Sequence, residues 1–174
     1  LEQILVKAVV EAREKRRRPT SEGRSRPLVG IQYYLWFGDG FGAEHWNDNA
    51  QFGHVSDHPF LGYYASDAGE TIEYHLTQFE AMSLDFVILN LHVDATGINQ
   101  LELRGIENLF EIAAARGSEL RFAIQVSPFD ADAGQISDFV SFIDETFAGR
   151  DEYFCIDGKP VLYWFWSGAY DGNR

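Results

Sequence analysis

The sequence predicts an α/β fold, the N-terminal half of a (β/α)8 TIM-type barrel with four parallel strands, preceded by a basic N-terminal helix. Two observations lead to this prediction. Short apolar runs rich in β-branched and aromatic residues alternate with apolar residues at helical spacing, as in chains built of βα units. In addition, a complete barrel needs about 250 residues, whereas this chain has 174.

Four runs have the composition of strands that are buried on both faces. They are long enough to cross a sheet, so each is predicted to be a strand. The last of them follows Asp157-Gly158, a turn dipeptide. The four runs lie near residues 28 to 35, 85 to 91, 120 to 127 and 160 to 166.

Three stretches between these runs carry an apolar stripe that recurs every three or four residues, which predicts helices. We expect Ser66 or Asp67 to cap the first helix, with Glu70 completing a capping box from Asp67. Gly117 is predicted to end the second helix. The three helices are predicted near residues 68 to 83, 100 to 116 and 135 to 148.

Strands that alternate with helices indicate right-handed βαβ units and a parallel sheet. The alternative to a half barrel is an open four-stranded parallel sheet, in which residues 160 to 166 would form a very apolar edge. In either arrangement this edge needs cover, and we expect a protein partner there. Because the chain starts at Leu1 and stops soon after the fourth run, we expect both ends to be cuts or limits of an ordered region.

Charge divides the chain into two parts. Residues 1 to 26 hold 8 of the 14 Lys and Arg and 4 of the 27 Asp and Glu, a net charge of +4, which leaves 6 − 23 = −17 for residues 27 to 174. The first part is predicted to be a basic helix and linker, and the second a partial barrel domain. An acidic domain repels phosphate backbones, so no nucleic-acid partner is expected. The cluster from Arg13 to Arg18 could touch an anionic membrane, but a solvated helix end is favoured.

A long loop rich in aromatic residues joins the first predicted strand to the first predicted helix. In a parallel barrel, the loop after a strand opens onto the active face. Flat rings beside hydrogen-bonding side chains suit sugars, because a pyranose has an apolar C–H face and a rim of hydroxyls. The alternative is that these rings form a satellite core under the loop. The rings and histidines of the loop are Trp36, Phe37, Phe41, Trp46, Phe52, Phe60, Tyr63, Tyr64, His45, His54 and His58.

The sequence predicts neither a metal nor another cofactor. His54 and His58 have the spacing of a helical zinc motif, but Gly53 and Pro59 indicate a loop. Cys155 is the only cysteine, which excludes an internal disulfide, and we expect it to be buried.

Four blocks of residues, taken in order, carry a resemblance. They are Tyr33-Tyr34-Leu35-Trp36-Phe37, Glu44-His45-Trp46-Asn47, Pro59-Phe60-Leu61-Gly62-Tyr63-Tyr64-Ala65-Ser66-Asp67 and Leu84-Asp85-Phe86-Val87-Ile88-Leu89-Asn90. The chain from about residue 28 to residue 168 resembles the N-terminal half of the glycoside hydrolase family 99-like domains. These include the endo-α-mannosidases and related domains of bacterial polysaccharide and lipopolysaccharide biosynthesis proteins. Asp157 to Val161 also resembles the turn before a middle strand of that barrel.

The resemblance implies a barrel that acts on α-mannose-type or related glycans and needs no metal. Two departures put the shape of the subsites in question: Leu35 stands where a proline is common, and Leu91-His92 stands where tryptophans are frequent. The residues that the resemblance places in the sugar cleft are Tyr34, Trp36, His45, Trp46, Asp67, Asn90 and His92.

No catalytic residue is assigned. Glycoside hydrolysis generally needs two facing carboxylates, and in the resembling enzymes this pair comes from later strands. Glu44, Asp67, Asp94 and Asp130 could reach the same face, but Asp67 is equally explained as a helix cap, and Asp94 and Asp130 as solvated loop acids. Two hypotheses follow. The chain is part of a barrel that acts on an oligosaccharide or polysaccharide and is catalytic when later strands complete it, or it is a non-catalytic structural or glycan-binding subunit of a larger assembly.

Overall fold

The computed structural model describes residues 27–38, 45–46, 59–128 and 130–165, so the predicted helix and linker at residues 1–26 lie outside the described residues. Within the described part, strands and helices alternate as predicted. The elements are β1 (Gly30–Tyr34), α2 (Gly69–Ala81), β2 (Phe86–Asp94), β3 (Gly97–Ile98), α3 (Gln100–Arg116), β4 (Arg121–Pro128), α4 (Ala133–Ile143), the π-helical turn η1 (Asp144–Ala148), β5 (Cys155–Ile156), β6 (Lys159–Pro160) and β7 (Leu162–Trp164).

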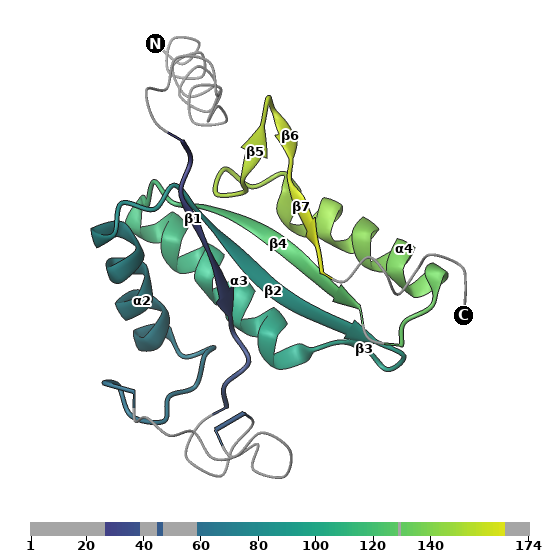
Figure 1. Ribbon diagram of the computed structural model, residues 1–174, viewed down its shortest axis with the longest axis horizontal. Coiled ribbons are helices and arrows are strands. Elements are labelled where there is room, and N and C mark those ends of the chain that lie inside the picture. The colour runs from purple at the N-terminus through teal and green to yellow at the C-terminus, as the bar shows by residue number, and fades with distance from the viewer. Residues whose placement is uncertain (1–26, 39–44, 47–58, 129, 166–174) are drawn as a thin grey trace, which may run out of the picture.

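Four strands form one parallel sheet in the order β1, β2, β4, β7 (Figure 1). The order in space is the order in the chain, and a helix separates each strand from the next. The four predicted parallel strands are therefore confirmed. The short strand β3 pairs antiparallel with the end of β2, and the β5–β6 hairpin forms a separate two-stranded sheet.

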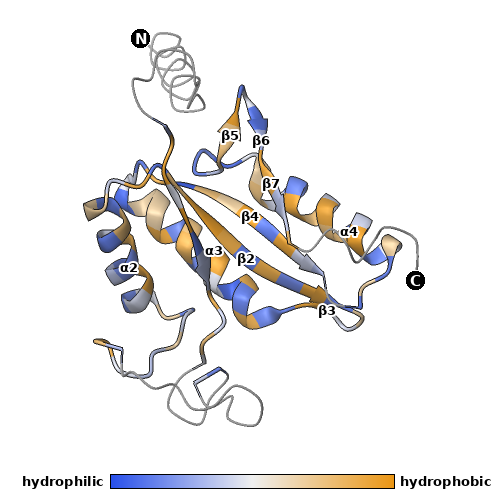
Figure 2. Cartoon of the chain, viewed as in Figure 1, coloured by the Kyte–Doolittle hydropathy of each residue, from blue (hydrophilic) through white to orange (hydrophobic). Residues whose placement is uncertain are grey.

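The helices α2, α3 and α4 lie on one side of this sheet (Figure 1). A doubly wound sheet has helices on both faces, whereas a (β/α) barrel has them only on the outside. Sequential strand order together with helices on one face therefore gives a partial barrel. Its core lies between the sheet and the helices, and the ribbons of β2, β4 and α3 carry much of the orange (hydrophobic) colour in Figure 2. The core includes Val87, Leu89 and Leu91 of β2, Ile72 and Leu76 of α2, Ile106 and Phe110 of α3, and Phe122, Ile124 and Val126 of β4.

The predicted cap of α2 is wrong. Ala68 occupies the N-cap position, and no side chain caps the helix. The carboxylate of Asp67 instead accepts a hydrogen bond from Nε of Arg104, at 3.1 Å, and the hydroxyl of Ser66 accepts one from the amide of Phe37, at 3.0 Å. Both candidate caps are therefore used to hold the first loop and α3 in place.

The two predicted glycine-dependent turns are confirmed. Gly117 ends α3 with a φ of 63°, in the left-handed region that favours glycine. Asp157 and Gly158 form the tight turn between β5 and β6, with φ values of 51° and 74°. This hairpin takes up the first part of the predicted fourth strand, so β7 is shorter than the predicted run.

The last helix starts earlier than predicted, at Ala133. Asp132 and Gln135 form a capping box in which the Asp132 carboxylate accepts from the Gln135 amide. Each such cap satisfies backbone groups that the first turn of a helix leaves without partners. The helix then continues into η1, which ends before Gly149.

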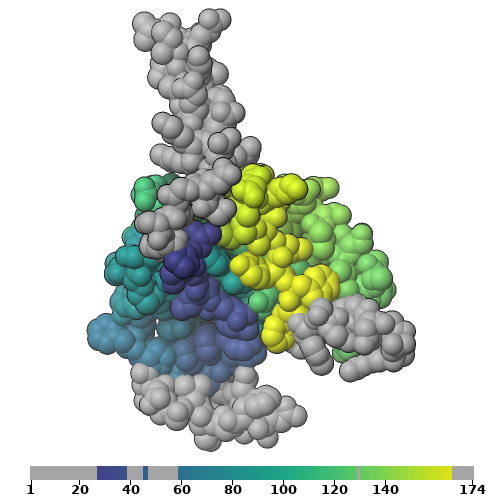
Figure 3. Space-filling view, turned by 45° about the horizontal axis from the view of Figure 1, so that its top comes forward, coloured from purple at the N-terminus to yellow at the C-terminus, as the bar shows by residue number. Residues whose placement is uncertain are grey.

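The strand β7 lies at the end of the sheet order, and its outward side chains are accessible. Leu162, Trp164 and Phe165 are 37%, 38% and 44% exposed. Figure 3 shows the yellow residues of β5 to β7 and the purple residues of β1 on the same side of the molecule. Over the described residues, no helix has the length and apolarity to cross a membrane.

Candidate functional site

Parallel pairing places polar side chains of neighbouring strands side by side. Alternate residues of a strand face opposite sides of a sheet, and the residues between these polar ones face the helices. The polar row therefore lies on the face away from the helices, at the carboxyl ends of the strands, where (β/α) barrels carry their sites. The paired residues of this row are Tyr34, Asn90, Gln125 and Tyr163. Two residues further along β2 and β4, His92 pairs with Ser127 on the same face.

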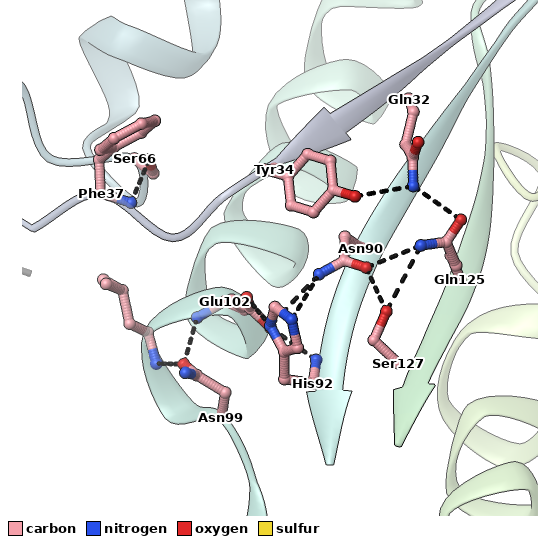
Figure 4. Close-up of polar contacts among 11 residues, drawn as sticks. Gln32, Tyr34, Phe37, Ser66, Asn90, His92, Asn99, Glu102, Gln125 and Ser127 are labelled. Carbon is pink, nitrogen blue, oxygen red and sulfur yellow. Dashed lines mark hydrogen bonds and ion pairs between the residues drawn. The ribbon is translucent and has the colours of Figure 1, made fainter. Parts of the chain in front are cut away.

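Amide side chains connect three strands across this face (Figure 4). Nε2 of Gln32 donates to Oε1 of Gln125 at 2.8 Å and to the hydroxyl of Tyr34 at 3.0 Å. Nε2 of Gln125 donates to Oδ1 of Asn90 at 2.8 Å, and the hydroxyl of Ser127 donates to the same oxygen. Asn90, Gln125 and Ser127 are buried. Since a buried amide is costly unless its groups are bonded, this network fixes the orientation of each amide.

Glu102 of α3 reaches the end of β2 from the helix side of the sheet. Its side chain is fully buried, and its Oε2 accepts from the backbone amide of His92 at 2.6 Å while Oε1 contacts Nδ1 of His92. Asn99 caps α3 and donates its own amide to the His92 carbonyl oxygen. Because that amide is already bonded, Glu102 does not close a capping box on Asn99 and is free to bind His92.

Aromatic rings gather above the polar row. The ring of Trp36 stacks on His45 with 4.5 Å between centroids, and it contacts Tyr34 at 4.6 Å. The His92 ring is parallel to it at 6.0 Å. Trp36 is half-buried, and its Nε1 is a buried donor without a partner among the described residues. Five of the residues that the resemblance places in a cleft are therefore neighbours here, namely Tyr34, Trp36, His45, Asn90 and His92.

Trp46, which the resemblance places in the sugar cleft, lies elsewhere, and its ring is not accessible. It is 3% exposed and stacks on Phe37 at 4.0 Å, with Tyr63 and Tyr64 against it edge to face. Its indole N–H donates to the carbonyl oxygen of Tyr64 at 2.9 Å. These residues form the satellite core that was the alternative explanation of the loop. The remaining loop histidines, His54 and His58, lie outside the described residues.

Asp67 is also separate from the polar row, because it is engaged by Arg104 at the start of the helical layer. Four members of the network were not predicted: Gln32, Gln125, Ser127 and Glu102. A signal for the first three exists in the sequence. Each lies two residues from another polar residue inside an apolar strand, and this period of two marks one face of a strand.

The acids near this face do not form a pair. Asp94 is exposed and holds the turn after β2, where its Oδ1 accepts from the amide and hydroxyl of Thr96; these bonds lower the pKa of Asp94. Asp130 is exposed, and Glu44 lies outside the described residues.

Burial raises the pKa of Tyr163, which keeps its phenol neutral. In the part of the chain that the structure describes, no three His, Cys, Asp or Glu side chains gather as a metal ion requires.

No protein-family model matches this chain, and no curated protein matches it. Solved structures do. A GH99 endo-alpha-mannosidase from Bacteroides thetaiotaomicron, in complex with bis-tris-propane, has a TM-score of 0.63 and 20% identity, covering 82% of this chain and 44% of that one. A second structure of the enzyme has a TM-score of 0.62 and 19% identity, covering 82% and 47%. A structure described as a glycoside hydrolase-like protein has a TM-score of 0.54 and 18% identity, covering 88% and 47%.

At these identities the likeness concerns the fold. The fold is glycoside hydrolase-like, and the half-barrel architecture that the resemblance implied is confirmed. This chain spans less than half the length of each of these solved chains. The carboxyl ends of its strands carry one face lined by aromatic and amide side chains.

Proposed function

We propose that this chain supplies part of the sugar-binding cleft of a carbohydrate-active barrel that acts on or binds α-mannose-type glycans. The observation that carries the proposal is that the rings of Trp36, Tyr34 and His45 meet the half-buried His92 and the buried Asn90. The mannosidase structures with the same fold support the choice of glycan. The rings of Trp36, Tyr34 and His45 offer apolar area, and the polar row offers hydrogen-bond donors and acceptors.

Sugar chemistry suits this combination. A pyranose buries its C–H face on an aromatic ring and directs its hydroxyls to amide, imidazole and phenol groups at the rim. Amides that are already held by their neighbours lose little conformational entropy on binding, so their hydrogen bonds contribute more to affinity. Gln32, the exposed member of the network, is held in this way by Gln125 and Tyr34.

Catalysis is proposed only for a barrel completed by later strands. Hydrolysis generally needs two carboxylates about 5 to 9.5 Å apart across the scissile bond. Among the described residues, Glu102 is bound to His92 and Asp94 holds a turn, so neither is offered as a catalytic group.

A second candidate is a non-catalytic subunit held in a larger assembly by its sheet edge. The observation that favours it is the exposure of Leu162 and Trp164 on β7 and of Phe165 directly after it. Such an apolar strand edge is normally covered by another strand or by a partner. The two candidates make different demands on the same protein: the first needs a glycan response, and the second needs a stable complex.

Calorimetric titration of the intact chain with an α-linked mannose oligosaccharide tests the first candidate. We expect Trp36→Ala to weaken binding by about 1 to 3 kcal/mol, the scale for one large apolar side chain. Trp164→Ala is the matched control, because it removes the same side chain from the face of the sheet opposite the polar row, and it should bind like the wild type. A wild-type protein with no glycan response would reject the proposal. Release of reducing ends from the same oligosaccharide separates a hydrolase from a binding subunit.

A further inference from the structure

Two hydrogen bonds join Phe37 and Ser66, at the two ends of the first loop, and we call this pair the neck of the loop. The amide of Phe37 donates to the hydroxyl of Ser66 at 3.0 Å, and the amide of Ser66 donates to the carbonyl oxygen of Phe37 at 2.8 Å. Figure 4 draws this pair apart from the polar row. Ser66 is fully buried, so its hydroxyl serves the neck and is not accessible to a ligand.

The neck acts on Trp36 through a single peptide unit. The N–H that Ser66 accepts belongs to the peptide bond between Trp36 and Phe37. A peptide unit is planar, so a bond that fixes this N–H also fixes the carbonyl group of Trp36 and the direction in which the chain leaves that residue. The Ser66 hydroxyl therefore restrains the backbone of Trp36 without touching its ring.

The two neighbouring rings lie in different surroundings. Phe37 stacks on the buried Trp46 at 4.0 Å and so belongs to the satellite core. Trp36 instead contacts Tyr34 at 4.6 Å and is parallel to His92, both on the polar row. The satellite core and the neck together hold Phe37, and Phe37 is bonded to Trp36. The satellite core is therefore the support of the candidate cleft as well as the filling of the loop.

The indole of Trp36 needs such a support. Its Nε1 is a buried donor that has no partner among the described residues. A buried donor without a partner costs free energy that contact with water would recover. The observed orientation of the ring is thus favoured only as long as other contacts restrain it, and the bond from the Trp36–Phe37 peptide to Ser66 is one of them.

We propose that Ser66 is a positioning residue for the candidate cleft, whose hydroxyl holds the Trp36–Phe37 peptide and thereby the Trp36 ring over the polar row. The use of this ring by a glycan rests on the proposed function, whereas the position of the ring does not. A ring that is already in place loses little freedom on binding, so more of its contact free energy appears as affinity. Ser66 then contributes to affinity without contact with the ligand.

Ser66→Ala removes the hydroxyl and changes the size of the side chain very little. Hydrogen exchange of the indole N–H groups, followed by NMR of the intact chain with nitrogen-15-labelled tryptophan, reports on Trp36 directly. We expect Trp36 to exchange about fivefold faster in the variant, the equivalent of one net hydrogen bond. The signal of Trp164, on the opposite face of the sheet, should stay as in the wild type. Equal exchange at Trp36 in the two folded proteins would overturn the proposal.

The wild type alone gives a second measurement. If the neck controls the ring, the Phe37 amide and the Trp36 indole N–H become accessible in the same opening and have the same protection against exchange. A Trp36 indole that is much less protected than the Phe37 amide would overturn the proposal, even if Ser66→Ala did not fold.

Calorimetric titration with an α-linked mannose oligosaccharide measures the consequence for binding. We expect Ser66→Ala to bind about fivefold more weakly than the wild type. Ser118→Ala is the matched control, because its hydroxyl also accepts from a backbone amide, that of Leu120 at 3.3 Å, and donates to Glu80 at 2.7 Å. This serine precedes β4, at the end of the sheet opposite the candidate cleft.

Ser118→Ala should lose stability and keep both the wild-type affinity and the wild-type exchange of Trp36. Equal losses of affinity in the two variants would assign the effect to stability and overturn the proposal, as would a Ser66→Ala protein with full affinity where the wild type binds. A wild-type chain that binds no glycan, with the expected exchange at Trp36, would reject the proposed function alone and leave the positioning of the ring by Ser66 in place.

Discussion

Leu35, between the Tyr34 and Trp36 of the candidate cleft, packs directly on Gly105 of α3. A β-carbon placed on Gly105 would lie 3.2 Å from both Cβ and Cδ2 of Leu35, which is fully buried. The helix therefore needs a residue without a side chain at this point for the first loop to leave β1 in its observed direction. That contact helps to hold the Trp36 ring above the polar row.

We predict that Gly105→Ala destabilises the protein. Alanine favours a helix over glycine by about 1 kcal/mol, but overpacking a filled core costs about 1 to 3 kcal/mol. The Leu35 Cβ cannot turn away by changing rotamer, so the clash should dominate, with a net loss of about 1 kcal/mol. Urea unfolding measures it. Gly69→Ala is the control, because its new β-carbon would meet only Ile112, at 3.8 Å. A Gly105→Ala protein that is more stable than the wild type would show that Leu35 moves aside and that the contact does not constrain the loop.

Trp46→Ala should be far more damaging to stability. The ring is buried against Phe37 and Tyr64 and donates to the Tyr64 carbonyl. Removing a buried tryptophan costs about 3 to 5 kcal/mol, so we expect a large drop in the unfolding midpoint. Phe60→Ala serves as the control, since Phe60 is 90% exposed in the same loop. Equal stability of the two variants would place the Trp46 ring outside the core.

The strands and helices were predictable because their apolar periods are local. The stripe of α3 and the glycine that ends it lie within one segment, and the structure places that helix at the predicted residues. The cap of α2 was not predictable in this way. Asp67 has the right residue type, but it is bound by Arg104, 37 residues later in the chain. Capping preferences describe neighbours in sequence and take no account of such a competitor.

The candidate site was predictable only in part, for a related reason. Asn90 and His92 are at the end of an apolar run, so strand polarity alone places them at the carboxyl edge of the sheet. Glu102 lies in the first turn of α3, where an acid is ordinary and usually solvated. Its burial follows from how α3 sits on β2, which the sequence period does not encode. Likewise, residue type did not separate the half-buried Trp36 from the buried Trp46.

Asp132→Ala should destabilise α4 through loss of its capping box. The Asp132 carboxylate accepts from the Gln135 amide at 2.8 Å, and the Gln135 side chain accepts from the Asp132 amide at 2.8 Å. Loss of an N-cap costs about 1 kcal/mol, and thermal unfolding should show a lower midpoint. Asp138→Ala, at an exposed position of the same helix, should cause no loss. If both variants lose stability equally, net charge and not capping is responsible.

His75 should make stability depend on pH. Burial lowers the pKa of His75, whose Nδ1 lies 2.7 Å from the Tyr33 hydroxyl, and burial raises the pKa of Tyr33, so both groups are neutral in the folded chain above pH 6.5 and below the ordinary tyrosine value of 10. The unfolded chain binds a proton on His75 near the ordinary value of 6.5, before the folded chain does. Stability should therefore be full above this value and fall as the pH drops through it.

Urea unfolding of the wild type and of His75→Gln between about pH 7.5 and pH 5 measures this dependence. We expect the variant to lose less stability on acidification than the wild type, because glutamine does not titrate. Asp94 does not interfere, since its lowered pKa acts only below its ordinary value of 3.8. Parallel curves for the two proteins would assign the pH dependence to the other histidines and leave His75 without a part in it.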